Sequence, residues 1–235
     1  MYALLLVLVG LPPLILALSR WKFGWSKQDW LQLGKSYLCV SVPFVLLDAF
    51  SHARGWWHYN PAYVSDLTLL GLPIEEVLFF FVIPFACLYL YSAMDRQFKK
   101  APVSKYFGWG SVALLLASLA VVSFFSPYER TIVDAVLLLA VLITWWAIRP
   151  RFTRPFVYWS VSIMLLFFTV NTALTALPIV EYGPEFGSQI RIGTVPFEDA
   201  WYNLSLLLGS WLVWAKAGRY PKPTADRLAS DRQSS

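Results

Sequence analysis

The chain has 235 residues, of which 58% are hydrophobic and only 14% are charged, and its mean hydropathy is +0.56. Soluble domains carry about 25% charged residues, so this composition cannot cover a water-facing surface and excludes an ordinary soluble protein. The formal net charge of +5 would suit a nucleic-acid partner, but the basic residues are distributed along the chain in a way that indicates membrane topology instead.

Seven apolar runs are each long enough to cross a membrane as a helix, which takes about 20 residues. In chain order they cover about 1–19, 30–50, 73–93, 106–126, 131–149, 155–177 and 196–216. The first run lacks the basic start and the small-residue cleavage site of a signal peptide. We therefore predict an all-α integral membrane protein with seven transmembrane helices.

Basic residues gather in alternate connections. The connections after the first, third and fifth helices and the tail after the seventh hold most of them. The other three connections hold one each, namely Arg54, Arg130 and Arg191. The positive-inside rule then places the N-terminus outside and the C-terminus in the cytoplasm, as in a multi-pass protein of the cell (inner) membrane. The charge indicates topology, and no nucleic-acid partner is expected.

One segment of the sequence occurs twice, 123 residues apart. Pro73-Ile74-Glu75-Glu76 returns as Pro196-Phe197-Glu198-Asp199, at the start of an apolar run in each case. The same offset relates further residues, which are Tyr59 with Tyr182, Pro61 with Pro184, and Asp48 with Asn171. The chain therefore has the pattern of a duplicated membrane unit.

The duplication divides the chain into a first three-helix repeat at 1–105, a linker helix at 106–126, a second repeat at 127–217 and a disordered cytoplasmic tail at 218–235. Three spans reverse the side of the membrane on which the chain emerges, so one extra helix restores the orientation of the second unit. We predict 3+1+3 parallel repeats. Both acidic motifs should then lie on the outer side, at the same depth.

Two interpretations of the acidic motif compete. Proline and acidic residues are favoured in the first turn of any helix, so the motif could be a simple cap. Its repetition together with Asp48 favours a site, because acidic groups inside a membrane usually face a bundle interior. Glu75 and Glu76 are about 100° apart on a helix, so at least one should face the bundle. Carboxyls in a poorly hydrated site can act as general acids.

Other chemistries find little support in the sequence. No Gly-rich fingerprint is present, so no dinucleotide or other cofactor is expected. Cys39 and Cys87 both fall inside predicted helices, and His52 and His58 lack partners at metal-ligand spacing. No metal site is expected.

The chain resembles the integral-membrane, non-flavin lycopene cyclases, which occur as heterodimers or fused chains in bacteria, archaea and fungi. The resemblance covers about 1–217 and is most specific at Leu72-Pro73-Ile74-Glu75-Glu76, which runs into Phe79-Phe80-Phe81. The second half departs from the pattern at Thr194, Asp199 and Asn171. The chain is similar to the fused form, in which both family subunits are joined by the fourth helix.

This resemblance implies a lycopene β-cyclase, which protonates a linear carotenoid end group and closes it to a β-ring without net redox change. Glu75 and Glu198 are the candidate acid and base, because that glutamate is the same in both repeats. The supporting acids would be Glu76, Asp199 and Asp48, and the candidate substrate-binding residues are Tyr59, Tyr182, Asn171, Trp57 and Phe79. The expected partners are membrane lipids and a carotenoid drawn from the bilayer, with the protein acting as a monomer or a homo-oligomer.

Two alternatives remain open at this point. Parallel three-helix repeats with a linker also describe small-solute transporters, although these would place polar residues near the midplane. A carotenoid hydratase or a longer-chain carotenoid cyclase would use the same acid chemistry. The sequence leaves open whether one or both ends of the substrate are cyclised, and whether the repeats form one shared site or two.

Overall fold

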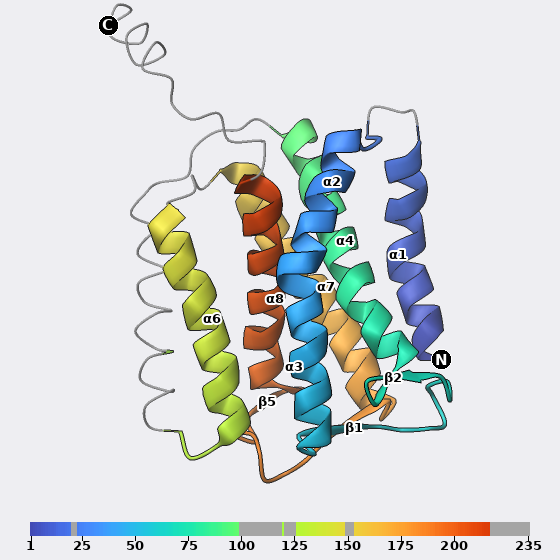
Figure 1. Cartoon of the computed structure of the whole chain (residues 1–235), viewed down its shortest axis with the longest axis vertical. Helices are drawn as coiled ribbons and strands as arrows, with labels where there is room; N and C mark the ends of the chain where they lie inside the picture. The colour runs from blue at the N-terminus through green and yellow to red at the C-terminus, as the bar shows by residue number, and fades with distance from the viewer. Residues whose placement is uncertain (20–22, 99–118, 120–125, 149–152, 217–235) are drawn as a thin grey trace, which may run out of the picture.

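The computed structural model describes residues 1–19, 23–98, 119, 126–148 and 153–216. These residues form a bundle of long helices whose axes run in roughly the same direction (Figure 1). The predicted linker helix at 106–126 falls on residues that, apart from 119 and 126, are not described, and the predicted tail at 218–235 lies wholly outside the described residues.

The helices follow the apolar runs. In chain order they are α1 (Tyr2–Leu18), α2 (Lys27–Ser36), a π-helical turn (Tyr37–Ser41), α3 (Val42–Ala53), α4 (Ile74–Gln97), α6 (Glu129–Ile148), α7 (Arg154–Ala176) and α8 (Phe197–Lys216). A capping box between Ser26 and Asp29 begins α2, which continues through the π turn into α3.

Four of these helices are long and apolar enough to cross a membrane: the continuous helix Lys27–Ala53, α4, α6 and α7. Helix α1 is apolar but has only 17 residues. Helix α8 has 20 residues and begins with the acidic pair Glu198 and Asp199. The chain is thus predominantly helical, with helices suited to a membrane, as the composition predicted.

Short strands in the two long connections are an addition to the predicted all-α class. They are β1 (Trp57–Tyr59), β2 (Thr68–Leu69) and β3 (Leu72–Pro73) in one connection, and β4 (Val180–Tyr182), β5 (Arg191–Ile192) and β6 (Val195–Pro196) in the other. Strands this short carry no period-2 signal in the sequence, so only backbone pairing in the folded chain reveals them.

The element boundaries repeat with the offset of the sequence motif. Helix α3 ends at Ala53 and α7 at Ala176, while α4 begins at Ile74 and α8 at Phe197, and each pair is 123 residues apart. The β2–β3 hairpin pairs Thr68 with Pro73, and the β5–β6 hairpin pairs Arg191 with Pro196, again at that offset. Each third helix therefore starts from the same local structure.

The turns of the two hairpins differ at both central residues. Leu70 and Gly71 have φ of 56° and 82°, whereas in the second turn Gly193, at the position of Leu70, has φ of 65°. Thr194, at the position of Gly71, has no positive φ, and its hydroxyl lies 2.6 Å from that of Thr175. Glycine tolerates left-handed backbone, so the departure at Thr194 comes with a shift in where the glycine is needed.

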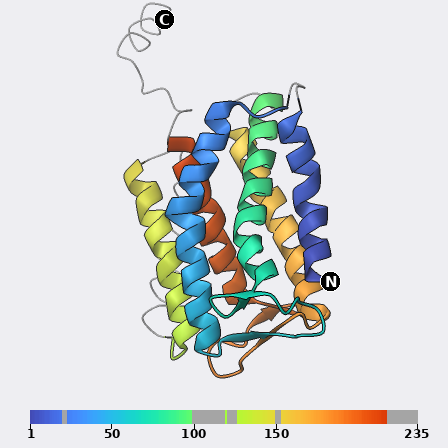
Figure 2. The same cartoon turned by 45° about the vertical axis from the view of Figure 1, so that its right-hand side comes forward.

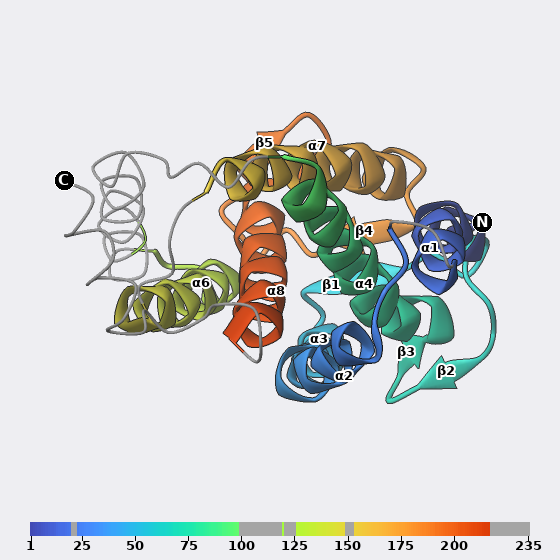
Figure 3. The same ribbon diagram turned by 90° about the horizontal axis from the view of Figure 1, so that it is seen from above.

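Helices α4 and α8 lie at the centre of the bundle when it is viewed along its axis (Figure 3). Helix α1 packs on α4 as α6 packs on α8, so each first helix contacts the third helix of its own half. The second helical spans do the opposite, because α7 packs on α4 while α2 and the π turn pack on α8. The two halves are thereby interleaved, and a site between α4 and α8 is shared by both.

The two long connections meet at one end of the bundle (Figures 1 and 2). Strands β1 and β4 pair antiparallel across the two halves, with Trp57 opposite Tyr182. The N-terminus lies at the same end, where the amino group of Met1 donates to the carbonyl of Tyr63 at 3.0 Å. This pairing, which we call the β1–β4 strap, covers the ends of the central helices.

Candidate active site

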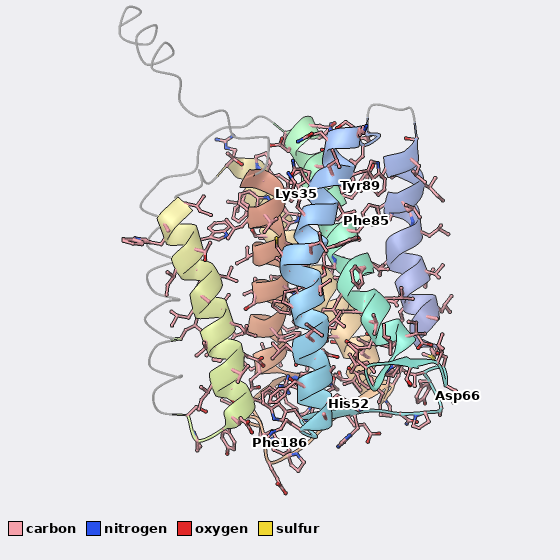
Figure 4. The ribbon with its side chains drawn as sticks, in the orientation of Figure 1. Lys35, His52, Asp66, Phe85, Tyr89 and Phe186 are labelled. Carbon is pink, nitrogen blue, oxygen red and sulfur yellow. The ribbon has the colours of Figure 1, made fainter. Side chains whose placement is uncertain are left out.

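A cavity of about 580 Å³, counting its open mouth, lies beneath the β1–β4 strap. His52 and Phe186 mark this end of the bundle, whereas Lys35 and Tyr89 mark the other (Figure 4). Eight of the ten predicted site residues line the cavity, and these are Asp48, Trp57, Tyr59, Glu76, Phe79, Asn171, Tyr182 and Asp199. Residues from both halves of the duplication therefore share one cavity.

The two carboxyls of the first half have hydroxyl partners. The hydroxyl of Tyr2 donates to Oε2 of Glu76 at 2.7 Å, and that of Tyr59 donates to Oδ2 of Asp48 at 3.1 Å. Burial, and then the neighbouring carboxyl of Asp48, raises the pKa of Tyr59 well above its usual range. The Tyr59 hydroxyl therefore keeps its proton and acts as a donor.

The carboxyl of the second half has a cationic partner. Asp199 accepts a hydrogen bond from the Tyr182 hydroxyl at 2.5 Å and also forms an ion pair with Arg130. Nε of Arg130 lies 3.5 Å from Oδ2 of Asp134, four residues along α6. Burial and the carboxyl of Asp199 raise the pKa of Tyr182 well above its usual range, so this hydroxyl also remains a donor.

Arg130 was counted in the sequence as a basic residue of an outer connection, and the structure corrects this. It is the second residue of α6 and only 3% exposed. Its guanidinium carbon lies 4.6 Å from the ring centroid of Tyr182 and 5.2 Å from that of Trp57. The signal that could have identified it is the i, i+4 pair with Asp134 in an otherwise apolar run, because charges in such runs usually face a bundle interior.

Glu75 and Glu198 do not line the cavity. Glu75 accepts from the backbone N–H of Ser65 at 2.9 Å and from its hydroxyl at 3.0 Å. Glu198 accepts from the backbone N–H of Ser188 at 2.7 Å and from the hydroxyl of Thr131 at 2.7 Å. Adjacent residues on a helix point about 100° apart, so where Glu76 and Asp199 face the cavity their neighbours face the connections, which they fasten to the helix starts.

The two halves of the cavity are not equivalent in charge. The counterpart of Asp48 is Asn171, whose amide donates to the carbonyl of Phe167 at 3.3 Å. Among the described residues that line the cavity there are three carboxyls, on Asp48, Glu76 and Asp199, and one cation, Arg130. Charged groups buried without a counter-charge are costly, so this set favours a state in which at least one of the carboxyls holds a proton.

Two comparisons connect this arrangement to known proteins. A protein-family model described as lycopene cyclase matches residues 1–94 and 128–216, which is more than half of the chain and includes both acidic motifs. The chain belongs to the lycopene cyclase family.

Curated relatives agree with this membership over a shorter stretch. The lycopene beta-cyclases of two strains of Halobacterium salinarum, R1 and NRC-1, are each 39% identical to this chain over 71 residues. The alignment covers 29% of this chain and 29% of each relative, so it spans less than a third of the length of the curated relatives. The comparison with solved structures found no match.

Proposed function

We propose that this family member is a lycopene β-cyclase, a membrane enzyme that closes the linear end groups of lycopene, or a close carotenoid relative, to β-rings. The observation that carries the proposal is a cavity, shared by both halves, that the described part of the chain lines with three carboxyls, one guanidinium and several aromatic rings. Family membership supports the same reaction class.

The proposed chemistry moves protons only. An acid protonates the terminal double bond of the end group, and the resulting carbocation is attacked by a neighbouring double bond of the same chain. A base then removes a proton from the new ring, which regenerates a double bond and leaves the composition of the substrate unchanged. Because no electrons are transferred, the steps need no redox cofactor.

We assign the acid to the first half of the chain. Glu76 meets a neutral hydroxyl, that of Tyr2, and a buried carboxyl without a cation is costly to leave ionised. Asp48 lines the same cavity and is held by Tyr59, and repulsion between two carboxyls in one poorly hydrated cavity favours a proton on one of them. Glu76 is the proposed proton donor, and Asp48 supports it.

The second half would supply the permanent negative charge. Asp199 is paired with the guanidinium of Arg130, which keeps it ionised and fixed in place. An ionised carboxylate at this position can stabilise the carbocation and accept the proton that the ring loses. The faces of Phe79, Phe80 and Phe167, which also line the cavity, would stabilise the cation further.

The membrane arrangement is part of the proposal. We propose seven helices in 3+1+3 parallel repeats, with the N-terminus and both long connections outside and the C-terminus in the cytoplasm of a cell whose inner membrane holds the protein. The shared end of the two connections supports this arrangement (Figure 2). The carotenoid would enter from the bilayer, where such apolar molecules dissolve.

Expression of the chain in lycopene-producing bacteria tests the activity. Pigment analysis should show conversion of lycopene to β-carotene, γ-carotene or both. Unchanged lycopene in cells whose membranes contain the folded protein would refute the proposal, and a hydroxylated or longer-chain product would identify a different acid-catalysed reaction. Uptake of a polar solute by vesicles, without any effect on pigment, would instead indicate a transporter.

Neighbouring glutamates on α4 test the assignment of the acid. Glu76→Gln keeps the size of the side chain and an oxygen for Tyr2, but it removes the transferable proton, so cyclisation should fall about 10²–10⁴-fold. Glu75→Gln is the matched control, because Glu75 contacts Ser65 outside the cavity, and it should retain most activity. If Glu75→Gln were inactive and Glu76→Gln active, the assignment would be wrong.

A further inference from the structure

A second, narrower space, of about 260 Å³ counting its open mouth, adjoins the first. The two share four lining residues, Phe79, Phe167, Asn171 and Asn203. The remaining walls of the second cavity come from one face each of α4, α7 and α8, and they are apolar apart from a thiol. The space is therefore an apolar continuation of the cavity that holds the carboxyls.

The second cavity leads away from the carboxyls along the bundle. Its wall on α4 consists of Phe79, Ile83 and Cys87, which lie four residues apart and hence on one helix face. At 1.5 Å per residue this wall is about 12 Å long. It begins within one turn of Glu76, so the two cavities together run from the acid group towards the middle of the bundle.

The duplication provides an internal comparison, because three aromatic rings pack together at equivalent positions of the other half. The positions that match Phe79, Phe167 and Asn203 are those of Tyr202, Phe44 and Phe80, each 123 residues away. These three rings pack on one another, with centroids 5.0 Å apart for Phe44 and Tyr202, 6.2 Å for Phe80 and Tyr202, and 6.4 Å for Phe44 and Phe80.

Asn203 is the residue that opens the space. It stands where the other half has the ring of Phe80, and it is only 6% exposed. Its Nδ2 atom has no hydrogen-bond partner among the described residues. Buried amide groups are normally hydrogen-bonded, so an unpaired amide here does not contribute to stable packing. Phe80 at the matching position of the other half indicates that a phenyl ring is compatible with the fold.

We infer that the second cavity is a subsite for the conjugated chain of the substrate, with the end group held at Glu76 and Asp199. This inference rests on the proposed function. A conjugated polyene is apolar, stiff and extended, so an end group at the acids requires a narrow apolar passage beside it. Because packed rings occupy the matching positions of the other half, the inference places one such subsite among the described residues, so that one end group is accepted at a time.

The test measures retention of lycopene by the purified full chain, separately from its conversion. All variants carry Glu76→Gln, so that bound lycopene stays unchanged. Asn203→Phe introduces the residue of the matching position and should lower the amount of co-purified lycopene about tenfold by filling the subsite. Ile163→Phe, at a cavity wall residue that is 1% exposed, should do the same from α7.

The matched control is Leu165→Phe, on the same helix but 66% exposed, which should retain lycopene at the level of the parent. Full retention in a folded Asn203→Phe or Ile163→Phe variant would overturn the subsite and leave the space as a packing void. The proposed function would survive that result, because it depends on pigment conversion by the unmodified chain. If the unmodified chain did not convert lycopene but Asn203→Phe still lowered its retention, the proposed reaction would be refuted and a polyene-binding site would remain.

Discussion

The buried guanidinium of Arg130 offers the sharpest test of how the site is held together. It forms ion pairs with Asp199 and Asp134, and all three residues are largely buried, with relative exposures of 3%, 9% and 1%. Arg130→Gln removes the cation and leaves both carboxyls without a counter-charge. Removing one partner of a buried ion pair costs about 3–5 kcal/mol.

Arg54 is the matched control at the same end of the bundle. It is paired with Glu129 at 2.8 Å, but the two side chains are 51% and 42% exposed. Exposed pairs contribute about 0–1 kcal/mol. In a chain of this size 1 kcal/mol shifts the unfolding temperature by about 2–4 °C, so Arg130→Gln should lower it by roughly 6–20 °C and Arg54→Gln by less than about 4 °C.

Thermal unfolding of the purified protein in detergent measures both shifts. Asp134→Asn added to Arg130→Gln should recover part of the lost stability, because it removes one of the two orphaned charges. The unfolding temperature of Arg130→Lys should lie between those of the unmodified chain and Arg130→Gln, since one ammonium group cannot replace a guanidinium that spans two carboxyls. Equal shifts for Arg130→Gln and Arg54→Gln would refute the view that the Arg130 pairs are buried and required.

Three further substitutions examine a contact of the site, the packing beside the β1–β4 strap and a glycine of α2. Tyr2→Phe removes the hydrogen-bond donor to Glu76, which should cost about 1 kcal/mol of stability and slow cyclisation. The rate of pigment conversion in membranes measures the second effect. An unchanged rate would show that Tyr2 takes no part in the reaction. Gly183→Ala places a Cβ 2.7 Å from a backbone oxygen beside the β1–β4 strap, so it should lower the unfolding temperature. Gly34 has open space around it in α2, so Gly34→Ala should raise the unfolding temperature by favouring the helix. The opposite order of the two temperatures would contradict the packing described for the strap.

The acidic motif shows how far the sequence could be interpreted. Its repetition, the position of Asp48 and the matching tyrosines predicted that polar residues of both halves lie on the same side at one depth, and left open whether they form one site or two. The structure places Asp48, Glu76 and Asp199 in one cavity. The sequence preferred Glu75 and Glu198 because they are the same in both repeats, but identity between repeats also arises from a shared structural duty, here the bonds to Ser65 and Ser188.

Residues without a repeat partner were the ones that the sequence missed. Tyr2 and Arg130 lie on the first helix of each half, outside the motif, yet they contact Glu76 and Asp199 respectively. A hydroxyl in one half and a guanidinium in the other make the two acids chemically different. Positional comparison of the repeats could not predict this difference, because it arises from contacts between helices that are distant in the sequence.

The sequence by itself indicated a membrane setting, the helices that the structure describes and the duplication, because hydropathy, run length and residue spacing are local properties of the chain. It also determined that acidic residues begin the third helix of each repeat. Only the tertiary structure decided which carboxyl of each pair faces the cavity and which cation meets it. Those outcomes depend on the rotation of each helix about its axis and on the side chains of its neighbours, which are set when the two halves pack together.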